Sequence, residues 1–245
     1  MTAIKIKDLS YTYSGWGQQT EALKNISFDI EQGEFVVIAG PNGSGKSTLL
    51  SILSGMKNNY NGDVFINDKN IKTLIKQKHL FEHVYYMPQN ILKGCAPLLT
   101  VFENLFVSDL SISSMSKERK GRKFLEKKYM EIIESLGGDF GLNQTADTLS
   151  GGQRQLLSLA IAYIRSTDII LLDEPTASLD PEKTKTAETV MEKLKKENRT
   201  LVLVTHNKQQ AISKGDRTIG ISNGKIVYNK QMFDRNSDNV GVIWE

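Results

Sequence analysis

Cysteine is nearly absent from this 245-residue sequence, and long apolar runs are lacking altogether. The single cysteine, Cys95, cannot form an internal disulfide, so nothing in the sequence indicates an oxidising compartment. No uninterrupted apolar stretch approaches the roughly 18 to 20 residues that span a bilayer. Met1–Leu9 also lacks the apolar core of a signal peptide. We therefore expect neither a membrane-spanning nor a disulfide-stapled protein.

An excess of charge of one sign is lacking too. The 31 Lys and Arg residues against 28 Asp and Glu give a net charge of +3. Residues 116–128 alone carry +5, with seven basic and two acidic residues, so the other 232 residues sum to −2. This distribution argues against a nucleic-acid partner. A solvated helix face explains the basic segment better than attraction to anionic lipid, which stays the alternative.

Three continuous aliphatic runs predict the centre of the fold. They are Phe35–Ile38, Ile169–Leu172 and Leu201–Val204. Runs of this kind are typical of parallel strands that are buried on both faces. Polar or glycine-rich residues follow each run, where an α/β sheet places its ligands. The sequence therefore predicts a parallel sheet with a binding edge.

Other segments alternate between apolar and polar residues, which is typical of half-buried antiparallel strands. They are Lys5–Tyr13, Leu23–Ile30, Val64–Ile66 and the hairpin of Ile219–Ser222 and Lys225–Tyr228 around Asn223-Gly224. Helical spacing follows between residues 90 and 165, at Lys123–Leu136 and Gln153–Ile164. We predict one domain, with a core and antiparallel β subdomain at about 1–89 and 165–228 and a helical subdomain at about 90–164.

The segment Gly40–Ser47 matches the phosphate-loop pattern G-x-x-x-x-G-K-[ST] without a mismatch. It lies between a predicted strand and a predicted helix, Thr48–Leu53, which disfavours the alternative of a plain glycine-rich turn. Its backbone N–H groups can turn toward phosphate oxygens. We expect Lys46 to reach the β- and γ-phosphates and Ser47 to ligate Mg²⁺. The expected nucleotide ligands are Gly40, Pro41, Asn42, Gly43, Ser44, Gly45, Lys46, Ser47 and Thr48.

Two carboxylates, Asp173 and Glu174, end the Ile169–Leu172 strand. Asp173 is placed to hold Mg²⁺ through water, and Glu174 to orient and deprotonate an attacking water. A strand that leaves the core into solvent gives the same pattern. The phosphate loop in the same chain makes that alternative weak.

A second anion-binding segment, Leu149–Gln153, reads LSGGQ and precedes a predicted helix. Ser150 can cap this helix, and the two glycines expose backbone N–H donors. With this motif the sequence resembles the ATP-binding cassette (ABC) ATPases over nearly the whole chain. The resemblance implies an α/β fold: a P-loop NTPase core with a mostly parallel sheet, an antiparallel β subdomain and an inserted α-helical subdomain. It also implies hydrolysis of ATP with Mg²⁺, and a second cassette packed head to tail.

The resemblance implies roles for further residues. Contacts to the nucleotide held by the partner cassette would come from Ser150, Gly151, Gly152 and Gln153. Gln89 would sense Mg²⁺ and the γ-phosphate, Asp180 of Ser178-Leu179-Asp180 would link the two sites, and His206 would position the water of Glu174. The catalytic group would then be Lys46, Gln89, Glu174 and His206, and the metal group Ser47, Gln89 and Asp173. Tyr13 is favoured over Tyr11 as the ring that stacks on adenine, and simple strand packing is the alternative.

Transport is the work that the resemblance favours. The chain would be the peripheral motor of a bacterial importer at the cytoplasmic face of the membrane, with permease subunits and an extracytoplasmic substrate-binding protein as partners. A docking groove is expected at about Asn90–Phe106. The run Gly94–Leu105 is similar to importers associated with tryptophan or tyrosine, but the motor does not touch the cargo. The alternatives are an exporter motor and a non-transport cassette. Non-transport cassettes of the chromosome and repair types have a long coiled coil between the phosphate loop and the LSGGQ segment. Here the 103 positions between Lys46 and Leu149 are about what one helical subdomain needs.

Overall fold

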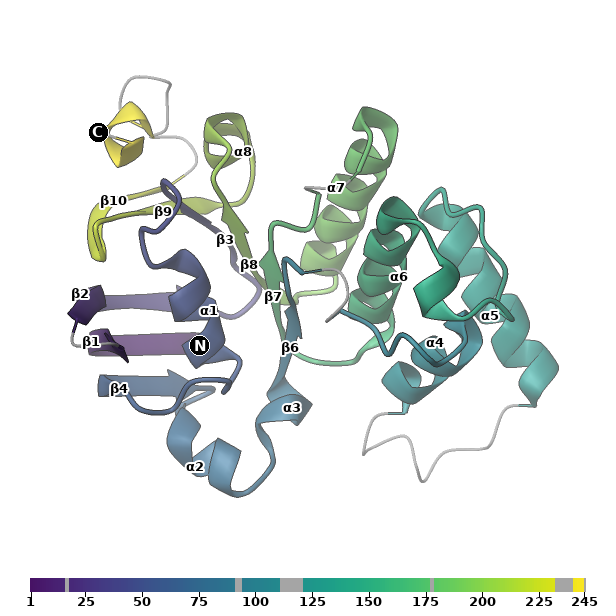
Figure 1. Cartoon of the computed structure of the whole chain (residues 1–245), viewed down its shortest axis with the longest axis horizontal. Coiled ribbons are helices and arrows are strands. Elements are labelled where there is room, and N and C mark those ends of the chain that lie inside the picture. The colour runs from purple at the N-terminus through teal and green to yellow at the C-terminus, as the bar shows by residue number, and fades with distance from the viewer. Residues whose placement is uncertain (16–17, 91–93, 111–120, 177–178, 232–239, 245) are drawn as a thin grey trace. The chain divides into compact units, whose positions relative to one another are not determined.

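The continuous aliphatic runs form the middle of a six-stranded sheet, in the order β10-β9-β3-β8-β7-β6 (Figure 1). In this computed structural model, β3 (Phe35–Ala39), β8 (Thr200–Thr205) and β7 (Ile169–Asp173) are parallel neighbours. Every residue of the three strands is buried, which explains why their sequences do not alternate. The predicted parallel sheet is therefore confirmed.

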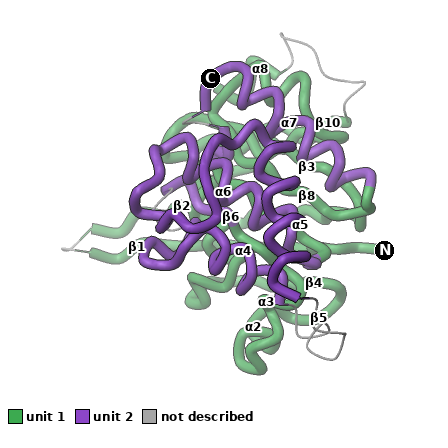
Figure 2. The backbone as a smooth tube through the Cα atoms, turned by 90° about the vertical axis from the view of Figure 1, so that its right-hand side faces the viewer, with its two compact units in different colours: residues 1–86, 168–173, 197–245 green, residues 87–167, 174–196 purple. Residues whose placement is uncertain are grey.

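The structure describes residues 1–15, 18–90, 94–110, 121–176, 179–231 and 240–244. Two compact units divide the chain (Figure 2). Unit 1 consists of residues 1–86, 168–173 and 197–245, and unit 2 of residues 87–167 and 174–196. Residues 174–196 are predicted to belong to the core, whereas in the structure they group with the helical residues of unit 2.

The edge strands of the six-stranded sheet are β6 (Val84–Met87) and β10 (Lys225–Gln231), and β9 (Arg217–Ser222) lies between β10 and β3. β9 and β10 form the predicted antiparallel hairpin, and both turn residues, Asn223 (φ 50°) and Gly224 (φ 78°), are left-handed. Two left-handed central residues are the requirement of a type I′ turn, which Asn-Gly meets at little cost.

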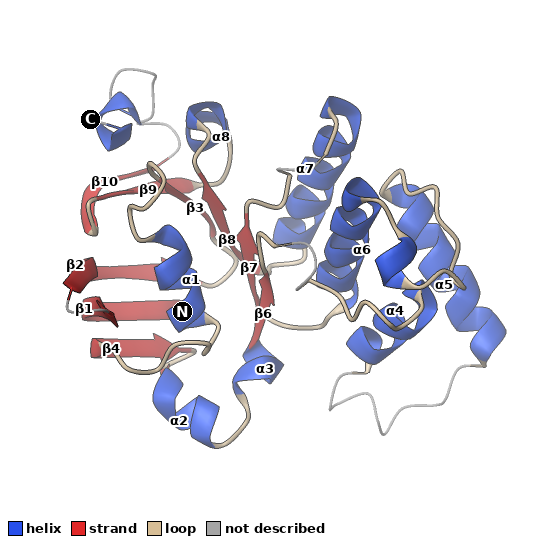
Figure 3. Cartoon of the chain, in the orientation of Figure 1, coloured by secondary structure: helices blue, strands red, loops and turns tan. Residues whose placement is uncertain are grey.

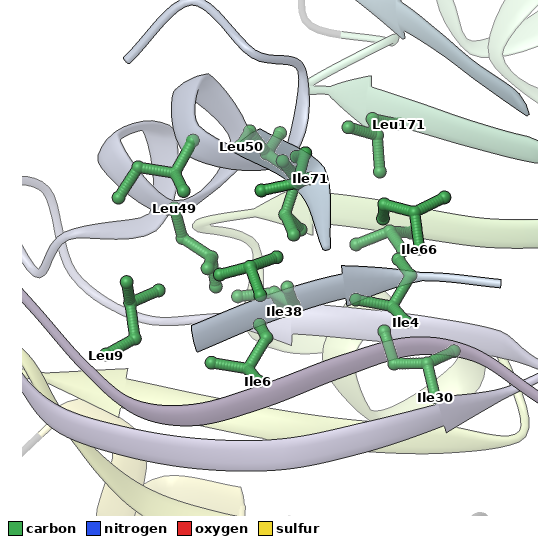
Figure 4. Packing of buried hydrophobic residues seen from close by; sticks show 14 of the residues in the cluster. Ile4, Ile6, Leu9, Ile30, Ile38, Leu49, Leu50, Ile66, Ile71 and Leu171 are labelled. Carbon is green, nitrogen blue, oxygen red and sulfur yellow. The ribbon is translucent and has the colours of Figure 1, made fainter. Parts of the chain in front are cut away.

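A second, antiparallel sheet belongs to unit 1 and has the order β2-β1-β4-β5. Its strands are β1 (Thr2–Gly15), β2 (Gln18–Glu31), β4 (Asn61–Ile66) and β5 (Lys69–Asn70). Ile4, Ile6 and Leu9 of β1 pack with Ile38 of β3 and with Leu49 and Leu50 in one hydrophobic core (Figure 4). Helix α1 (Lys46–Leu53), which carries Leu49 and Leu50, is thereby fixed at the end of β3.

Short helices complete unit 1. They are α2 (Ile71–Lys76), α3 (Leu80–His83), α8 (Lys208–Ser213) and the 3₁₀ turn η4 (Val242–Trp244). Ile243 of η4 is buried in a small cluster with Ala39 and Tyr228. The segment 240–244 therefore packs on the six-stranded sheet.

Unit 2 is mainly helical (Figure 3). Its helices are α4 (Val101–Asp109), α5 (Arg122–Ser135), η2 (Ala146–Thr148), α6 (Gly151–Ile164) and α7 (Pro181–Lys196). Tyr129 of α5 is fully buried, and its hydroxyl donates to Asp109 Oδ2 of α4 at 3.1 Å. The two helices predicted from the sequence are present as α5 and α6.

Among the described residues, no helix is both long and apolar enough to cross a bilayer.

Candidate active site

Three parallel strands, β3, β8 and β7, have their carboxyl ends side by side at the same end of the six-stranded sheet. Ala39 at the end of β3 is in register with Thr205 at the end of β8, and Asp173 at the end of β7 is opposite Val204. Because the strands are parallel, the residues that follow them leave from the same edge. The structure thus brings together in unit 1 the phosphate loop, Asp173 and His206.

Lys46 is buried at the start of α1 and turns its ammonium back into the phosphate loop. Its Nζ donates to the carbonyl oxygens of Gly40 at 2.9 Å and Pro41 at 2.8 Å. Only 6 % of the side chain is exposed. A cation held in this way, beside the N-terminus of a helix, favours an anion within the loop.

The glycines of the phosphate loop satisfy a steric demand. Gly43 (φ 79°) and Gly45 (φ 110°) have left-handed backbones, and a Cβ on Gly45 would collide with the carbonyl oxygen of Ala22. Within the described residues, the buried Ser44 hydroxyl has no hydrogen-bond partner. A hydroxyl of this kind fits a missing acceptor such as a phosphate oxygen.

Asp173 is 3 % exposed and accepts a hydrogen bond at its Oδ2 from the Tyr86 hydroxyl, 3.2 Å away. Burial and the nearby carboxylate raise the pKa of the Tyr86 hydroxyl, so it remains a donor across the neutral range. Ser47, the other predicted magnesium ligand of unit 1, is exposed in the first turn of α1. A hydroxyl and a carboxylate are hard oxygen ligands of the kind that suits Mg²⁺.

His206 is exposed immediately after β8. The turn that carries it is fixed by Thr205, whose hydroxyl accepts from the Asn207 N–H at 3.0 Å and donates to Gln210 at 2.7 Å. Asn207 in turn caps α8 by accepting from the backbone of Gln209 and Gln210. The imidazole therefore stands on a rigid turn at the sheet edge.

Tyr13 lies beside the phosphate-loop helix at the end of β1. Its hydroxyl shares a 3.0 Å hydrogen bond with the hydroxyl of Thr48, the third residue of α1. Tyr11 stands edge-on to Tyr13 at 4.9 Å, and the ammonium of Lys57 lies over both rings. Tyr13 is 41 % exposed, so strand packing alone does not account for it.

In unit 2, the side chains of Gln89 and Glu174 are in direct contact. Gln89 Nε2 donates to Glu174 Oε2 at 2.9 Å, although 85 positions separate the two residues. Glu174 has a left-handed backbone, with φ 51°. Conformations of this kind cost of order 1 kcal/mol or more in a residue other than glycine and cluster at functional sites.

The Leu149–Gln153 segment forms the N-terminus of α6. Ser150 accepts from the Gln153 N–H, and Gln153 Oε1 accepts from the Ser150 N–H at 2.9 Å, which is a capping box. This box begins the helix at Gly151, two residues before the predicted start. Gln153 Nε2 donates to Asp139 Oδ1 at 3.0 Å, and this bond holds the pKa of the Asp139 carboxyl below its usual range. The capping box does not use the N–H groups of Gly151 and Gly152 at this helix end.

Asp180 precedes α7 and accepts from the Lys183 N–H at 2.9 Å. It therefore has a helix-capping role besides the predicted link between two sites. Ser178, which belongs to the same motif, lies outside the described residues.

The predicted docking segment is only partly open. Val101 and Leu105 are fully buried, whereas Leu98 is 82 % exposed and Phe106 is 37 % exposed. Val101 and Leu105 therefore belong to the core of unit 2 and offer no apolar area to a partner. Residues 91–93, also assigned to the groove, lie outside the described residues.

Three contacting residues were not predicted from the sequence. Tyr86 donates a hydrogen bond to Asp173. The ammonium of Lys57 lies over the ring of Tyr13. Asp139 accepts a hydrogen bond from Gln153. Tyr86 is close to Gln89 in the chain, which was a usable signal. Lys57 and Asp139 lie in polar loops, where neither periodicity nor a motif marks them.

The predicted site residues fall into two groups. The phosphate loop, Tyr13, Asp173 and His206 belong to unit 1, and Gln89, Glu174, the Leu149–Gln153 segment and Asp180 belong to unit 2. The first group has the donors and the cation that a triphosphate requires.

Comparison with known proteins agrees with this chemistry. Residues 23–177 match the family model described as ABC transporter. A tyrosine transport ATP-binding protein of Clostridioides difficile is 34 % identical over 98 % of this chain and 95 % of that protein. A spermidine/putrescine import ATP-binding protein, PotA, of Mycoplasma mycoides is 30 % identical over 91 % of this chain and 60 % of that protein.

A solved structure shares the fold. The ATP-binding cassette MJ0796, determined as a dimer in a post-hydrolysis state with ADP and Pi, superposes with a TM-score of 0.82 at 29 % identity, over 95 % of this chain and 99 % of that one. With its phosphate loop, acidic strand end and LSGGQ helix, this chain belongs to the ABC transporter family and is an ATP-binding and ATP-hydrolysing cassette.

Proposed function

We propose that the chain is the motor subunit of a bacterial importer, in which ATP hydrolysis drives separate permease subunits. The observation that carries the hydrolytic part is the sheet edge of unit 1, where a buried Lys46 ammonium shares one strand edge with Asp173 and His206. A fixed cation, a carboxylate and an imidazole at one edge suit phosphoryl transfer, in which positioning and electrostatics dominate.

Each residue has a distinct task in the proposed reaction. The phosphate loop and Lys46 bind and orient the triphosphate of ATP. Ser47, Asp173 and Gln89 would hold Mg²⁺, which when bound would supply positive charge against the phosphates. Glu174 accepts the proton of the attacking water, and Gln89, which donates to Glu174, fixes the direction of the carboxylate. His206 donates a hydrogen bond to the γ-phosphate.

Two chains act together in this proposal. The Ser150 helix end, with the N–H groups of Gly151 and Gly152, binds the nucleotide held by a second copy. The capping box supports this assignment because it orders the helix end and does not use the N–H groups of the two glycines. Asp180 links the two nucleotide sites across the dimer.

Docking on a permease places the chain at the cytoplasmic face of the membrane. The exposed side chains of Leu98 and Phe106 offer apolar area for a permease helix. Transport is supported by the relative named for tyrosine transport, and import rather than export by the relative named for spermidine/putrescine import. Their cargoes differ, so we propose no cargo, and we propose an extracytoplasmic binding protein as the cargo receptor.

The hydrolytic assignment is tested by Lys46→Ala, with the exposed Lys69→Ala of the same unit as the matched control. We expect Lys46→Ala to lose ATP binding and phosphate release and Lys69→Ala to keep both. Near-normal turnover of Lys46→Ala would contradict the phosphate-loop assignment.

The transport assignment is tested by pull-down of the native chain from membranes. Recovery of a permease together with an extracytoplasmic binding protein is expected. A permease that is recovered with no binding protein would favour an exporter motor, and recovery of ribosomes or chromatin in place of a permease would contradict a transport role.

A further inference from the structure

Lys57 is a cation without an assigned role, and it lies beside Tyr13, the side chain that we propose to stack on adenine. It lies in the loop that follows α1, and its Nζ is 4.7 Å from the ring centre of Tyr13 and 4.9 Å from that of Tyr11. The same Nζ donates to the Tyr11 hydroxyl at 3.1 Å. This hydrogen bond raises the pKa of the Lys57 ammonium, which therefore stays charged through the neutral range.

The contacts fix the ring of Tyr13 from several directions. The hydroxyl is tied to Thr48, the ammonium of Lys57 covers a face, and Tyr11 stands edge-on at an interplanar angle of 75°. With 41 % of Tyr13 still exposed, part of the ring is open to a second flat partner. A side chain at a strand end would otherwise sample several rotamers, so these contacts pre-organise it for stacking.

We propose that Lys57 is a positioning residue for the nucleotide base: it holds Tyr13 in the orientation that stacks on adenine, and so contributes to affinity for a nucleotide over a bare polyphosphate. This inference rests on the proposed function, because it takes adenine to stack on Tyr13. Lys57 acts through the ring and contacts no phosphate.

The test compares the affinities of ADP and inorganic tripolyphosphate, measured by calorimetry on the full chain. Lys57→Met keeps the length of the side chain and removes the charge. A cation–π contact at an exposed site corresponds to about two- to five-fold in affinity. We expect Lys57→Met to weaken ADP by about this factor with tripolyphosphate unchanged, and Lys57→Arg to bind ADP like the parent chain.

Two further variants separate the possible causes. Lys72 lies over the ring of Tyr60 at 4.3 Å, so Lys72→Met removes an equivalent contact elsewhere in unit 1 and should change neither affinity. Tyr13→Ala removes the stacking ring and should weaken ADP about five-fold to a hundred-fold, with tripolyphosphate unchanged.

Failure of the inference differs from failure of the proposed function. If Lys57→Met weakens both ligands equally, Lys57 acts on phosphate by charge and the inference is wrong. If it weakens neither while Tyr13→Ala weakens ADP, adenine stacks on Tyr13 but Lys57 does not position the ring. If Lys57→Met does not fold, Tyr11→Phe, which removes the hydrogen bond to Lys57, takes its place with the same two ligands. A parent chain that binds no ADP would overturn the proposed function itself.

Discussion

Glu174 combines a strained backbone with a side chain that is held by Gln89. The backbone of Glu174 is left-handed, with φ 51°, and the 2.9 Å hydrogen bond from Gln89 Nε2 holds the end of its side chain. Neither feature stabilises the fold strongly, and strain of this kind persists where surrounding structure over-determines it. Its position directly after Asp173 is readable from the sequence, whereas its backbone conformation is not.

Substitution of Glu174 by Gln keeps the shape of the side chain and removes the carboxylate that we propose as the base. We expect Glu174→Gln to bind ATP with an affinity close to that of the parent chain and to release phosphate at a rate lower by about 100-fold or more, since general-base catalysis contributes typically 10²–10⁴-fold. Equilibrium ATP binding and a single-turnover phosphate assay measure the two quantities. Hydrolysis at the parental rate would exclude Glu174 as the base.

The ion pair between Arg217 and Glu34 is a structural feature of unit 1 that no motif marks. Arg217 makes two hydrogen bonds to the Glu34 carboxylate, at 2.7 and 3.0 Å, and both side chains are mostly buried, with 14 % and 12 % exposed. We expect Arg217→Met to lower the free energy of unfolding by about 3 kcal/mol, because it leaves a buried carboxylate without its partner. Urea unfolding measures this loss, and Glu34→Gln/Arg217→Met should recover part of it. Equal losses in the single and double variants would show that the unpaired Glu34 carboxylate is not the cause of the loss.

At the scale of elements, a helix or strand was predictable from the sequence where its burial follows a regular pattern along the chain. The three central strands are buried on both faces and have uniform aliphatic sequences, so they were predicted closely. Helix α4 was not predicted because some of its apolar residues are buried and others are exposed. Val101 and Leu105 are buried, but Val107 is 58 % exposed. No amphipathic period is visible in such a segment. Helix α7 has Ala187, Val190, Met191 and Leu194 at helical spacing, a signal that the prediction did not use.

The basic segment is also explained at this scale, as far as it is described. Within α5, Arg122 pairs with Glu126 at 2.8 Å, and Lys128 pairs with Asp109 of α4 at 2.7 Å. Paired charges along an exposed helix favour the interpretation as a solvated face. Residues 116–120 lie outside the described residues.

The capping box of α4 predicts a dependence of stability on acid. Thr100 donates to Glu103 from its backbone and its hydroxyl, at 2.8 Å each, and these bonds hold the pKa of the Glu103 carboxyl below its usual range. A lowered pKa in the folded state means that the stabilisation is full above the ordinary pKa of Glu and is lost as pH falls through the lowered value. We expect Glu103→Gln to reduce the acid dependence of unfolding between about pH 5 and 3. An unchanged pH profile would contradict the assignment.

At the scale of the whole molecule, the division into units was predicted only in part. The boundary between Asp173 and Glu174 passes through the acidic motif, and residues 174–196 leave the core to join the helices of unit 2. A boundary of this kind follows from tertiary packing of α7 on α6, which a local sequence pattern does not contain. The motifs themselves were predictable because each depends on a short run of residues and its flanking elements.

The central claim is that the phosphate loop of one chain and the Ser150 helix end of another complete one ATP site. Lys46→Ala should disable the first component, and Ser150→Arg should block the second while leaving ATP binding in its own chain intact. In a head-to-tail dimer of the two variants, one site carries both defects and the other carries neither.

The decisive measurement is therefore ATPase activity of the two variants alone and mixed at equal concentration. The head-to-tail arrangement predicts two chains that are inactive alone and a mixture that hydrolyses ATP. A mixture as inactive as its components, formed under conditions in which mass spectrometry shows mixed dimers, would contradict a site shared between chains.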